Sequence, residues 1–216
     1  HAPARRRPPR RLMTTPEPAR YVSRGGLKLE AGLDAAGIDP AGLWCVDLGC
    51  STGGFTDCLL KRGARRVYAV DTAYGELAWT LRNDERVVVM ERTNALHAEP
   101  DDDARARAGV DLAVIDLGWT PQARAIPAAL RWLKPDALIV TLIKPHYEVD
   151  KPELAKGGVL DPDRAAEVAR EVAGRVVGSG FQELAYVESP VQGGKTKNRG
   201  NREWLLALRR SPNPQP

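Results

Sequence analysis

The sequence lacks the features of a membrane-spanning or disulfide-rich protein. Three cysteines, Cys45, Cys50 and Cys58, are odd in number and form no Cys-x-x-Cys pair, which argues against a disulfide framework or a zinc site. We expect buried, reduced thiols. The longest apolar runs, such as 137–143, are strand-sized, whereas a membrane-spanning helix needs about 20 apolar residues. The amino-terminal stretch also lacks the apolar core of a secretory signal, so a cytoplasmic protein is expected.

The charge of the chain also says little about a partner. Lys and Arg number 32 against 28 Asp and Glu, a formal net charge of +4. Residues 1–12 contain five arginines and no acid, and they account for the whole excess. The rest of the chain is close to neutral, so net charge does not by itself indicate a polyanionic partner.

Composition divides the chain into one domain and two short ends. Residues 1–19 are rich in Arg and Pro and have no hydrophobic period, which predicts a disordered basic arm or leader. Residues 20–210 have the length of a single domain. We expect 211–216 to be a disordered tail, and Asp101–Asp103 and Asp150–Gly158 to be surface loops.

From Tyr21 onward, short β-branched runs alternate with helical stretches, a pattern typical of βαβ units and a parallel sheet. The pattern predicts seven strands at Leu43–Leu48, Val67–Asp71, Val87–Met90, Asp111–Asp116, Leu138–Lys144, Leu184–Glu188 and Trp204–Leu208. It predicts helices at Leu27–Ala36, Gly54–Arg62, Glu76–Arg82, Pro121–Leu133 and Pro162–Val177, the last capped by Asp161. The fold class is therefore α/β, a doubly wound Rossmann-like sandwich with a mostly parallel seven-stranded sheet.

A glycine-rich turn follows the first strand and points to a ligand site. Gly49, Gly53 and Gly54 would let the backbone approach a ligand at the carboxyl edge of the sheet, although a simple tight turn is the alternative. Asp71, at the end of the second strand, could accept hydrogen bonds from both ribose hydroxyls of an adenosine. Dinucleotides and S-adenosylmethionine both meet this condition. The glycine spacing departs from the G-x-G-x-x-G pattern of pyrophosphate sites and favours S-adenosylmethionine.

Charged and polar side chains follow other strands. Asp116 ends the fourth predicted strand and Lys144 the fifth, so both belong at the same sheet edge. A lysine that ends a buried strand is costly unless it is paired or lies in a functional cleft. Asn94, just beyond the third strand, could reach an adenine or simply form a turn. Lys28 and Glu203 resemble ordinary surface charges when each is considered alone.

Several motifs together resemble one known family. They are Val22–Leu29, Asp47–Leu60, Gly63–Leu77, Leu81–Asn94 and Ile143-Lys144-Pro145. These stretches are similar to the FtsJ-like ribosomal RNA methyltransferases, most of all to the hemolysin A (TlyA-type) branch, over about residues 21–209. Members transfer a methyl group from S-adenosylmethionine to a ribose 2′-hydroxyl.

The resemblance implies a cofactor, a set of site residues and an RNA partner. The family's Lys-Asp-Lys-Glu tetrad falls on Lys28, Asp116, Lys144 and Glu203. S-adenosylmethionine would be bound by Asp47, Gly49, Ser51, Gly53, Phe55, Asp71, Tyr74, Asn94 and Asp116. Lys144 would stabilise the developing alkoxide, Asp116 would orient Lys144, and no metal is required. Whether Lys144 also removes the proton stays open, since an adjacent carboxylate favours the charged ammonium.

RNA contact also has support outside the resemblance. Lys195, Lys197, Arg199 and Arg202 cluster among glycines just before the last strand, which suits phosphate contacts as well as a solvated loop. Trp119 and Tyr147 are candidate platforms for a splayed base. Core packing is expected instead for Trp44, Trp79 and Trp132.

The chain departs from the family in ways that affect substrate choice. The TlyA-type branch usually carries an RNA-binding S4 domain ahead of the catalytic domain, and here fewer than twenty unstructured residues are expected before Tyr21, so recognition differs or the chain is trimmed. Asp116-Leu117-Gly118-Trp119 replaces the family's Asp-Leu-Ser-Phe, and Lys144-Pro145-His146-Tyr147-Glu148 replaces Lys-Pro-Gln-Phe-Glu. The target nucleotide could therefore differ.

Two other functions remain as alternatives. The first is a catalytically inactive RNA-binding or hemolysin-like protein that retains the fold, although the membrane version would need an amphipathic basic helix or a span. The second is a dinucleotide oxidoreductase, which the glycine spacing disfavours. Base methylation is less suited, because Asp116 is not followed by the Pro-Pro-aromatic turn of amino-group methylases and no cysteine after residue 58 could attack a base.

Overall fold

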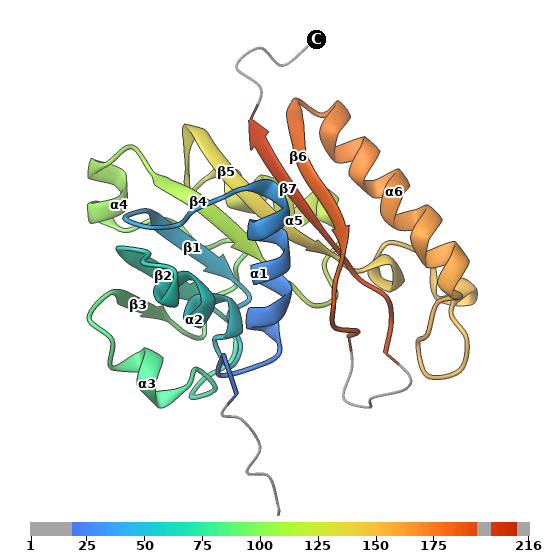
Figure 1. Cartoon of the computed structure of the whole chain (residues 1–216), viewed down its shortest axis with the longest axis horizontal. Coiled ribbons are helices and arrows are strands. Elements are labelled where there is room, and N and C mark those ends of the chain that lie inside the picture. Colours follow the sequence, from blue (N-terminus) through green and yellow to red (C-terminus); the bar gives the residue numbers. More distant parts are fainter. Residues whose placement is uncertain (1–18, 194–199, 211–216) are drawn as a thin grey trace, which may run out of the picture.

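A computed structural model describes residues 19–193 and 200–210, which fold around one twisted seven-stranded sheet (Figure 1). The strand order is β3-β2-β1-β4-β5-β7-β6. The strands are β1 (Trp44–Leu48), β2 (Arg66–Val70), β3 (Val87–Met90), β4 (Val110–Ile115), β5 (Leu133–Ile143), β6 (Phe181–Glu188) and β7 (Trp204–Arg210). The expected α/β class with a mostly parallel seven-stranded sheet is confirmed.

Strand direction decides which residues meet at one edge. The five strands β1 to β5 pair in parallel, so their carboxyl ends lie together. Strand β7 is antiparallel to both of its neighbours, β5 and β6. Its first residue, Trp204, is opposite Ile143, the last residue of β5. The segment that enters β7 therefore lies at the same edge as the carboxyl ends of the parallel strands.

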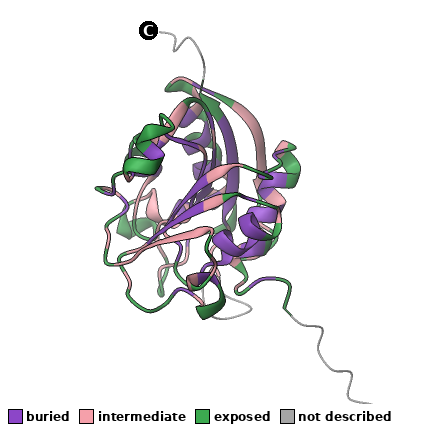
Figure 2. Ribbon diagram, turned by 90° about the vertical axis from the view of Figure 1, so that its left-hand side faces the viewer, coloured by how far each residue is buried: buried purple, intermediate pink, exposed green. Residues whose placement is uncertain are grey.

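Helices cover both faces of the sheet. Helices α1 (Gly25–Ala36), α2 (Gly54–Lys61) and α3 (Trp79–Arg82) pack on one face, and α4 (Asp102–Ala106), α5 (Gln122–Leu130) and α6 (Pro162–Gly178) pack on the other. Burial is concentrated in the sheet and on the inward faces of these helices (Figure 2). Asp161 caps α6 by accepting hydrogen bonds from the backbone N–H groups of Asp163 and Arg164, as predicted.

Several predicted elements differ from the structure, and β6 begins at Phe181, three residues before its predicted start. Helix α5 ends at Leu130 and β5 already begins at Leu133, because the backbone around Trp132 and Leu133 pairs with Val110 of β4. Helix α3 begins only at Trp79, three residues after the predicted start. Asp101–Asp103, predicted as loop, instead opens α4: the Asp101 carboxylate accepts a hydrogen bond from the Ala104 N–H at 2.9 Å, and Ala104 is buried.

The aromatic and cysteine predictions have mixed outcomes. Trp132 is fully buried and Trp44 partly buried, but the core assignment of Trp79 is wrong, since it is 74% exposed at the start of α3. All three cysteines are free and buried, as expected. Among the described residues, no helix has the length and apolarity to cross a bilayer. The predicted arm and tail, 1–18 and 211–216, lie outside the described residues.

Candidate active site

The carboxyl edge of the sheet brings together charged residues that are far apart in the sequence. Asp71 directly follows β2, Asp116 follows β4 and Lys144 follows β5. Glu203 directly precedes β7, and Lys28 reaches the same edge from the first turns of α1. The topology therefore gathers the four predicted tetrad residues, of which Lys28 and Glu203 carried no signal of their own.

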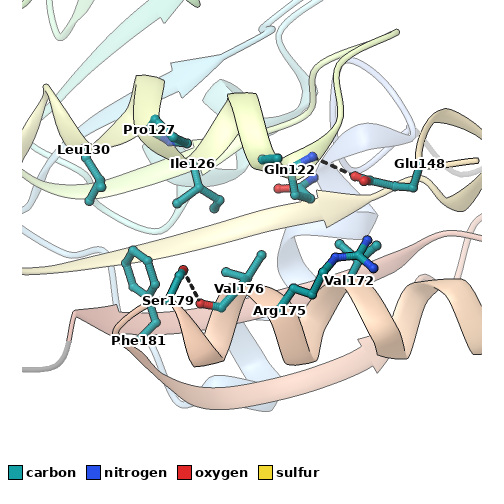
Figure 3. A pocket seen from close by; sticks show the side chains of 11 residues that line it. Gln122, Ile126, Pro127, Leu130, Glu148, Val172, Arg175, Val176, Ser179 and Phe181 are labelled. Atoms are coloured by element: carbon teal, nitrogen blue, oxygen red, sulfur yellow. Dashed lines mark hydrogen bonds between the residues drawn. The ribbon is translucent and has the colours of Figure 1, made fainter. Parts of the chain in front are cut away.

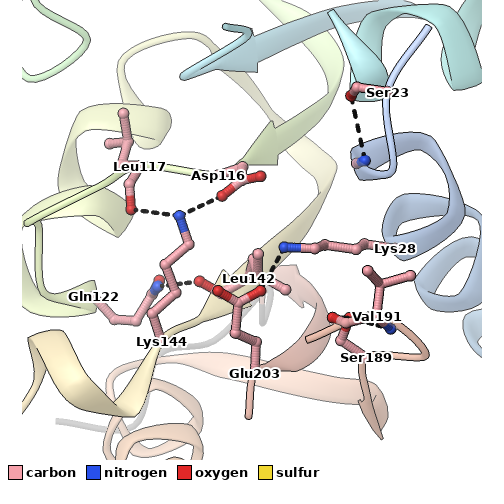
Figure 4. Close-up of polar contacts among 11 residues, drawn as sticks. Ser23, Lys28, Asp116, Leu117, Gln122, Leu142, Lys144, Ser189, Val191 and Glu203 are labelled. Carbon is pink, nitrogen blue, oxygen red and sulfur yellow. Dashed lines mark hydrogen bonds and ion pairs between the residues drawn. The ribbon is translucent and has the colours of Figure 1, made fainter. Parts of the chain in front are cut away.

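The four residues form two short ion pairs (Figure 4). Lys144 Nζ is 2.5 Å from Asp116 Oδ1 and also donates to the Leu117 carbonyl at 3.2 Å. Lys28 Nζ is 2.5 Å from Glu203 Oε2, and these two side chains are only 12% and 4% exposed. Two cations and two carboxylates thus lie side by side at the margin of the core, where charge interactions are stronger than in bulk water.

Burial and pairing act in opposite directions on these groups. Burial lowers the pKa of Lys144, but the charge and hydrogen bond of Asp116 outweigh it, so the pKa lies above its ordinary value. Burial raises the pKa of Glu203 despite the charge of Lys28. Burial and the nearby lysines Lys144 and Lys28 lower the pKa of His146 to about 4, so its imidazole is neutral at pH 7.

The glycine turn after β1 needs a glycine at its first position. Gly49 has φ +94°, and a Cβ there would lie 2.7 Å from the backbone oxygen of Asp116. Its N–H donates to the Val70 carbonyl at 2.9 Å. The turn is thereby held between the ends of β2 and β4, and its backbone forms part of the wall of a cleft.

Two hollows flank this turn. The Asp71 hollow, about 290 Å³, is lined by Gly49, Ser51, Val70, Asp71, Thr72, Asn94, Ala95, Leu96, Asp116, Leu117, Gly118, Trp119 and Thr120. The Phe55 hollow, about 380 Å³, is lined by Ser23, Arg24, Gly25, Lys28, Gly49, Cys50, Ser51, Thr52, Gly54, Phe55, Asp116 and Gly193. Both include Gly49, Ser51 and Asp116, so they are two halves of one cleft along the glycine turn.

Asp71 is oriented by backbone contacts. Its Oδ2 accepts from the N–H of Ser51 and its Oδ1 from the N–H of Ala73, each at 2.8 Å. These bonds fix the carboxylate at the rim of the Asp71 hollow, with Asn94 in the wall of the same hollow. Each carboxylate oxygen has further acceptor capacity for a ligand's hydroxyl groups.

Three predicted cofactor-binding residues line neither half of this cleft. Asp47 is fully buried beneath the turn, where it accepts a hydrogen bond from the Thr56 hydroxyl at 2.7 Å. Gly53 faces Leu77 and Leu81, whose side chains leave no room for a Cβ. Tyr74 is 69% exposed and packs against the Arg92 guanidinium at 4.2 Å. Asp47 and Gly53 therefore support the turn from below, and Tyr74 contacts Arg92 outside it.

The buried Asp47 predicts a pH dependence of stability. Burial raises its pKa to about 7, and Oδ1 has no hydrogen-bond partner among the described residues. The folded chain then keeps a proton on Asp47 that the unfolded chain releases near pH 4. The free energy of unfolding should therefore decrease as the pH rises from about 4 to 7, by at most about 1.4 kcal/mol per pH unit. Urea unfolding at several pH values measures this. The free energy of unfolding of Asp47→Asn minus that of the wild type should increase as the pH rises through this window and stay constant above it. A difference independent of pH would contradict the assignment.

A third hollow, the Lys144 hollow, lies beside the ion pairs. It measures about 500 Å³ and is lined by Lys28, Asp116, Trp119, Lys144, His146, Tyr147, Leu154, Gly157, Gly158, Val159, Gly193, Gly200, Asn201 and Glu203. It shares Lys28, Asp116 and Gly193 with the Phe55 hollow. Lys28 and Asp116, one member of each ion pair, therefore lie where the cleft and this third hollow meet.

The rim of the Lys144 hollow is aromatic. Trp119 is 85% exposed, and its ring centroid is 4.8 Å from that of Tyr147. The His146 ring follows at 4.0 Å from Tyr147, and its Nδ1 is buried without a hydrogen-bond partner among the described residues. A Trp exposed to this extent at a hollow is unusual outside binding surfaces.

The predicted RNA-binding cluster lies mostly outside the described residues. Lys195, Lys197 and Arg199 fall within 194–199, which the structure does not describe. Arg202 is described, and its guanidinium donates to both carboxylate oxygens of Glu188 at 2.7 and 2.6 Å and to the Pro162 carbonyl. As a phosphate ligand, Arg202 would first have to leave this ion pair, so we interpret it as a structural cation.

A separate groove lies between α5 and α6 (Figure 3). Its walls are mainly apolar, with Ile126, Leu130 and Phe181 among them. Glu148 lies at one end, where it accepts a hydrogen bond from the Gln122 N–H at 2.7 Å and burial raises its pKa. No predicted site residue lines this groove, so it is distinct from the charged edge.

Sequence reasoning missed several residues that shape the site. Ser23, Arg24 and Gly25, at the start of α1, line the Phe55 hollow. The only feature of the sequence that could have indicated them is their position within the family-like motif Val22–Leu29. Asn201 lines the Lys144 hollow and bonds to the opposite loop. A single asparagine in a glycine-rich stretch gave no sign of this.

Comparison with known proteins identifies the family. The sequence profile of the FtsJ-like methyltransferase family matches residues 21–210, nearly the whole chain. The chain belongs to the FtsJ-like methyltransferase family. The expected family and enzyme class are thereby confirmed.

Relatives agree with this assignment. A protein of Mycobacterium tuberculosis named 16S/23S rRNA (cytidine-2'-O)-methyltransferase TlyA is 46% identical over 88% of this chain and 68% of its own length. A solved structure from Lactococcus lactis, described as a hemolysin, is 35% identical, with a TM-score of 0.79 and 89% of each chain covered. A Mesorhizobium loti S-adenosylmethionine-dependent methyltransferase shares the fold at 18% identity, with a TM-score of 0.56 over 85% of this chain and 98% of its own.

Proposed function

We propose that this FtsJ-like methyltransferase transfers a methyl group from S-adenosylmethionine to a ribose 2′-hydroxyl of ribosomal RNA. The observation that carries the proposal is the position of the two lysine–carboxylate pairs, at the junction of the cleft and the Lys144 hollow. The name of the Mycobacterium tuberculosis relative supports both the ribose position and the ribosomal substrate, and it suggests cytidine as the target.

The cleft suits S-adenosylmethionine in shape and in donor set. Asp71 would bind the two ribose hydroxyls, and Asn94 the adenine side, in the Asp71 hollow. The methionine part would lie in the Phe55 hollow, against Gly49, Ser51 and Phe55. A Cβ at Gly49 would collide with the Asp116 backbone, so the glycine keeps this turn against the end of β4 and beside the cleft. Asp47 and Gly53 would act by holding the turn.

The chemistry then depends on the charged lysines. S-adenosylmethionine supplies, when bound, a methyl group on a positively charged sulfur. Lys144 would donate a hydrogen bond to the ribose oxygen and stabilise the negative charge that develops on it. Its raised pKa favours the ammonium form, so it would act on the oxygen by its charge, and the hydroxyl proton would pass to solvent water as the methyl group is transferred. Asp116 holds Lys144, and Glu203 holds Lys28 against the same hydroxyl.

The Lys144 hollow would accept the target nucleotide. Its volume of about 500 Å³ is in the range of small-molecule sites. Trp119 and Tyr147 would stack on a base turned out of the RNA, as proteins commonly recognise single-stranded RNA. The neutral His146 ring continues the aromatic rim and adds no charge to it at pH 7.

Neutralising Lys195, Lys197 and Arg199 together should weaken RNA binding. Each phosphate that the variant no longer neutralises should reduce the slope of log K against log salt by about 0.7 to 0.9, so the slope should flatten by about 2 to 3. Filter binding at several salt concentrations measures this. Arg202→Gln is the matched control, since Arg202 is held by Glu188 and should change the slope little. An unchanged slope in the triple variant would argue against the loop as an RNA contact.

The decisive test is direct methylation with a matched acceptor. We expect the purified chain to transfer labelled methyl to ribosomal RNA, and mapping of the product to place the label on a ribose 2′-oxygen. Replacing the mapped nucleotide by its 2′-deoxy form should abolish transfer, whereas a base methylase would still act. Binding of RNA without methyl transfer would instead support the catalytically inactive alternative.

A further inference from the structure

Two loops contribute most of the lining of the Lys144 hollow that is not aromatic. One loop precedes α6 and contributes Leu154, Gly157, Gly158 and Val159. The other precedes β7 and contributes Gly193, Gly200, Asn201 and Glu203. The described residues of the two loops share no regular ladder, so side-chain contacts must set the distance between them.

Asn201 makes two of those contacts, beside the Arg202 guanidinium, which donates to the Pro162 carbonyl at 3.1 Å. Asn201 Oδ1 accepts a hydrogen bond from the Leu160 N–H, and Asn201 Nδ2 donates to the Gly158 carbonyl, both at 2.9 Å. An N–H can only donate and a carbonyl can only accept, so both bonds are made in one orientation of the amide. The Asn201 carbonyl also accepts from the Gly193 N–H at 3.0 Å. Asn201 thus connects the two loops and also joins Gly193 to the segment that enters β7. We call this junction of Gly193, Gly200 and Asn201 the neck.

The same neck packs directly on a tetrad residue. A Cβ at Gly193 would lie 2.3 Å from Glu203 Oε1, and one at Gly200 would lie 1.7 Å from the Gly193 oxygen. The Glu203 carbonyl accepts from the Ser189 N–H at 2.8 Å, which fixes its backbone. Because Gly193 and Gly200 have no free space around them, a shift of Asn201 would move this wall of the hollow.

We propose that Asn201 is a positioning residue that fixes the two loops of the Lys144 hollow at the separation needed to accept the target nucleotide. This inference rests on the proposed function. Without the Asn201 side-chain hydrogen bonds, the loops should occupy a wider range of positions, so that RNA must order them on binding. The effect should therefore appear mainly in KM for RNA, with little effect on S-adenosylmethionine, whose predicted cleft shares only Lys28, Asp116, Trp119 and Gly193 with the Lys144 hollow.

Two substitutions distinguish the two side-chain bonds. Asn201→Ala removes both, and we expect KM for RNA to rise about tenfold and kcat to fall less than about threefold. Asn201→Asp keeps the acceptor for Leu160 and removes the donor to Gly158, so KM should rise about threefold. Asn83→Ala is the control, because Asn83 also donates to a backbone carbonyl, that of Trp79, but lines none of the three hollows.

The measurements are steady-state methylation of ribosomal RNA, calorimetric titration with S-adenosylmethionine and amide hydrogen exchange. Exchange at Leu160 should accelerate in the alanine variant and stay slow in the aspartate variant, while S-adenosylmethionine affinity is unchanged in both. If the alanine variant does not fold, an unchanged KM in the aspartate variant overturns the inference. An active wild type beside variants with unchanged KM overturns this inference alone. A wild type that transfers no methyl to RNA overturns the proposed function and this inference with it.

Discussion

Lys144→Ala should abolish methyl transfer while leaving S-adenosylmethionine binding nearly intact. The ammonium is the cation that Asp116 holds at 2.5 Å at the meeting point of the cleft and the Lys144 hollow. Removing one such stabilising group from an enclosed site typically costs about 100- to 1000-fold in kcat, and we expect a loss of about 1000-fold. Single-turnover methylation of ribosomal RNA measures the rate, and calorimetry measures the affinity for S-adenosylmethionine.

A matched lysine at the opposite end of the sheet provides the control. Lys134 is also 2.5 Å from an aspartate, Asp111, but at the amino edge, and it lines none of the three hollows. Lys134→Ala should remove an ion pair of similar geometry and retain full turnover. Turnover retained in Lys144→Ala, or abolished equally in both variants, would exclude the catalytic role proposed for Lys144.

Asp71→Ala should weaken S-adenosylmethionine binding by about 100-fold. The change removes the carboxylate that would accept both ribose hydroxyls, and it leaves the N–H groups of Ser51 and Ala73 without their acceptor. The glycine turn should then become less ordered, in addition to the missing ligand interaction. Calorimetric titration with S-adenosylmethionine measures the change, and the same titration of the wild type with NAD should show no binding.

The control for this variant is Asp84→Ala. Asp84 also accepts a hydrogen bond from a backbone N–H, that of Arg86, but lines none of the three hollows. Its removal should leave S-adenosylmethionine affinity unchanged. Equal effects in the two variants would indicate a general loss of structure, and an unaffected Asp71→Ala would remove Asp71 from the cofactor site.

The secondary structure could be predicted largely from local sequence. All seven strands were predicted, because a buried strand is a short apolar run bounded by turn residues, although β5 and β6 begin earlier than expected. The errors lie where a distant partner decides. Strand β5 starts early because Val110 of β4 pairs with Leu133. Helix α4 forms because Asp101 caps it and Ala104 is buried.

Only some residues of the candidate site could be predicted from their position in the sequence. Residues that end predicted strands, Asp71, Asp116 and Lys144, could be placed at one edge by the rule for parallel sheets alone. Lys28 and Glu203 could be named only through the family resemblance. Trp79 was wrongly expected in the core, and the ion pair of Arg202 with Glu188 was not expected, since composition reveals neither an exposed indole ring nor a distant partner.

The sequence by itself determined which strands and helices form, which chemical groups end the strands and which family the motifs resemble, because each of these depends on residues close together in the chain. The tertiary structure alone decided which groups touch. Lys28 and Glu203 are 175 residues apart and meet at 2.5 Å because α1 packs on the sheet face beside the antiparallel β7. Asn201 joins two loops for the same reason: contacts between distant segments exist only once the sheet has set their positions.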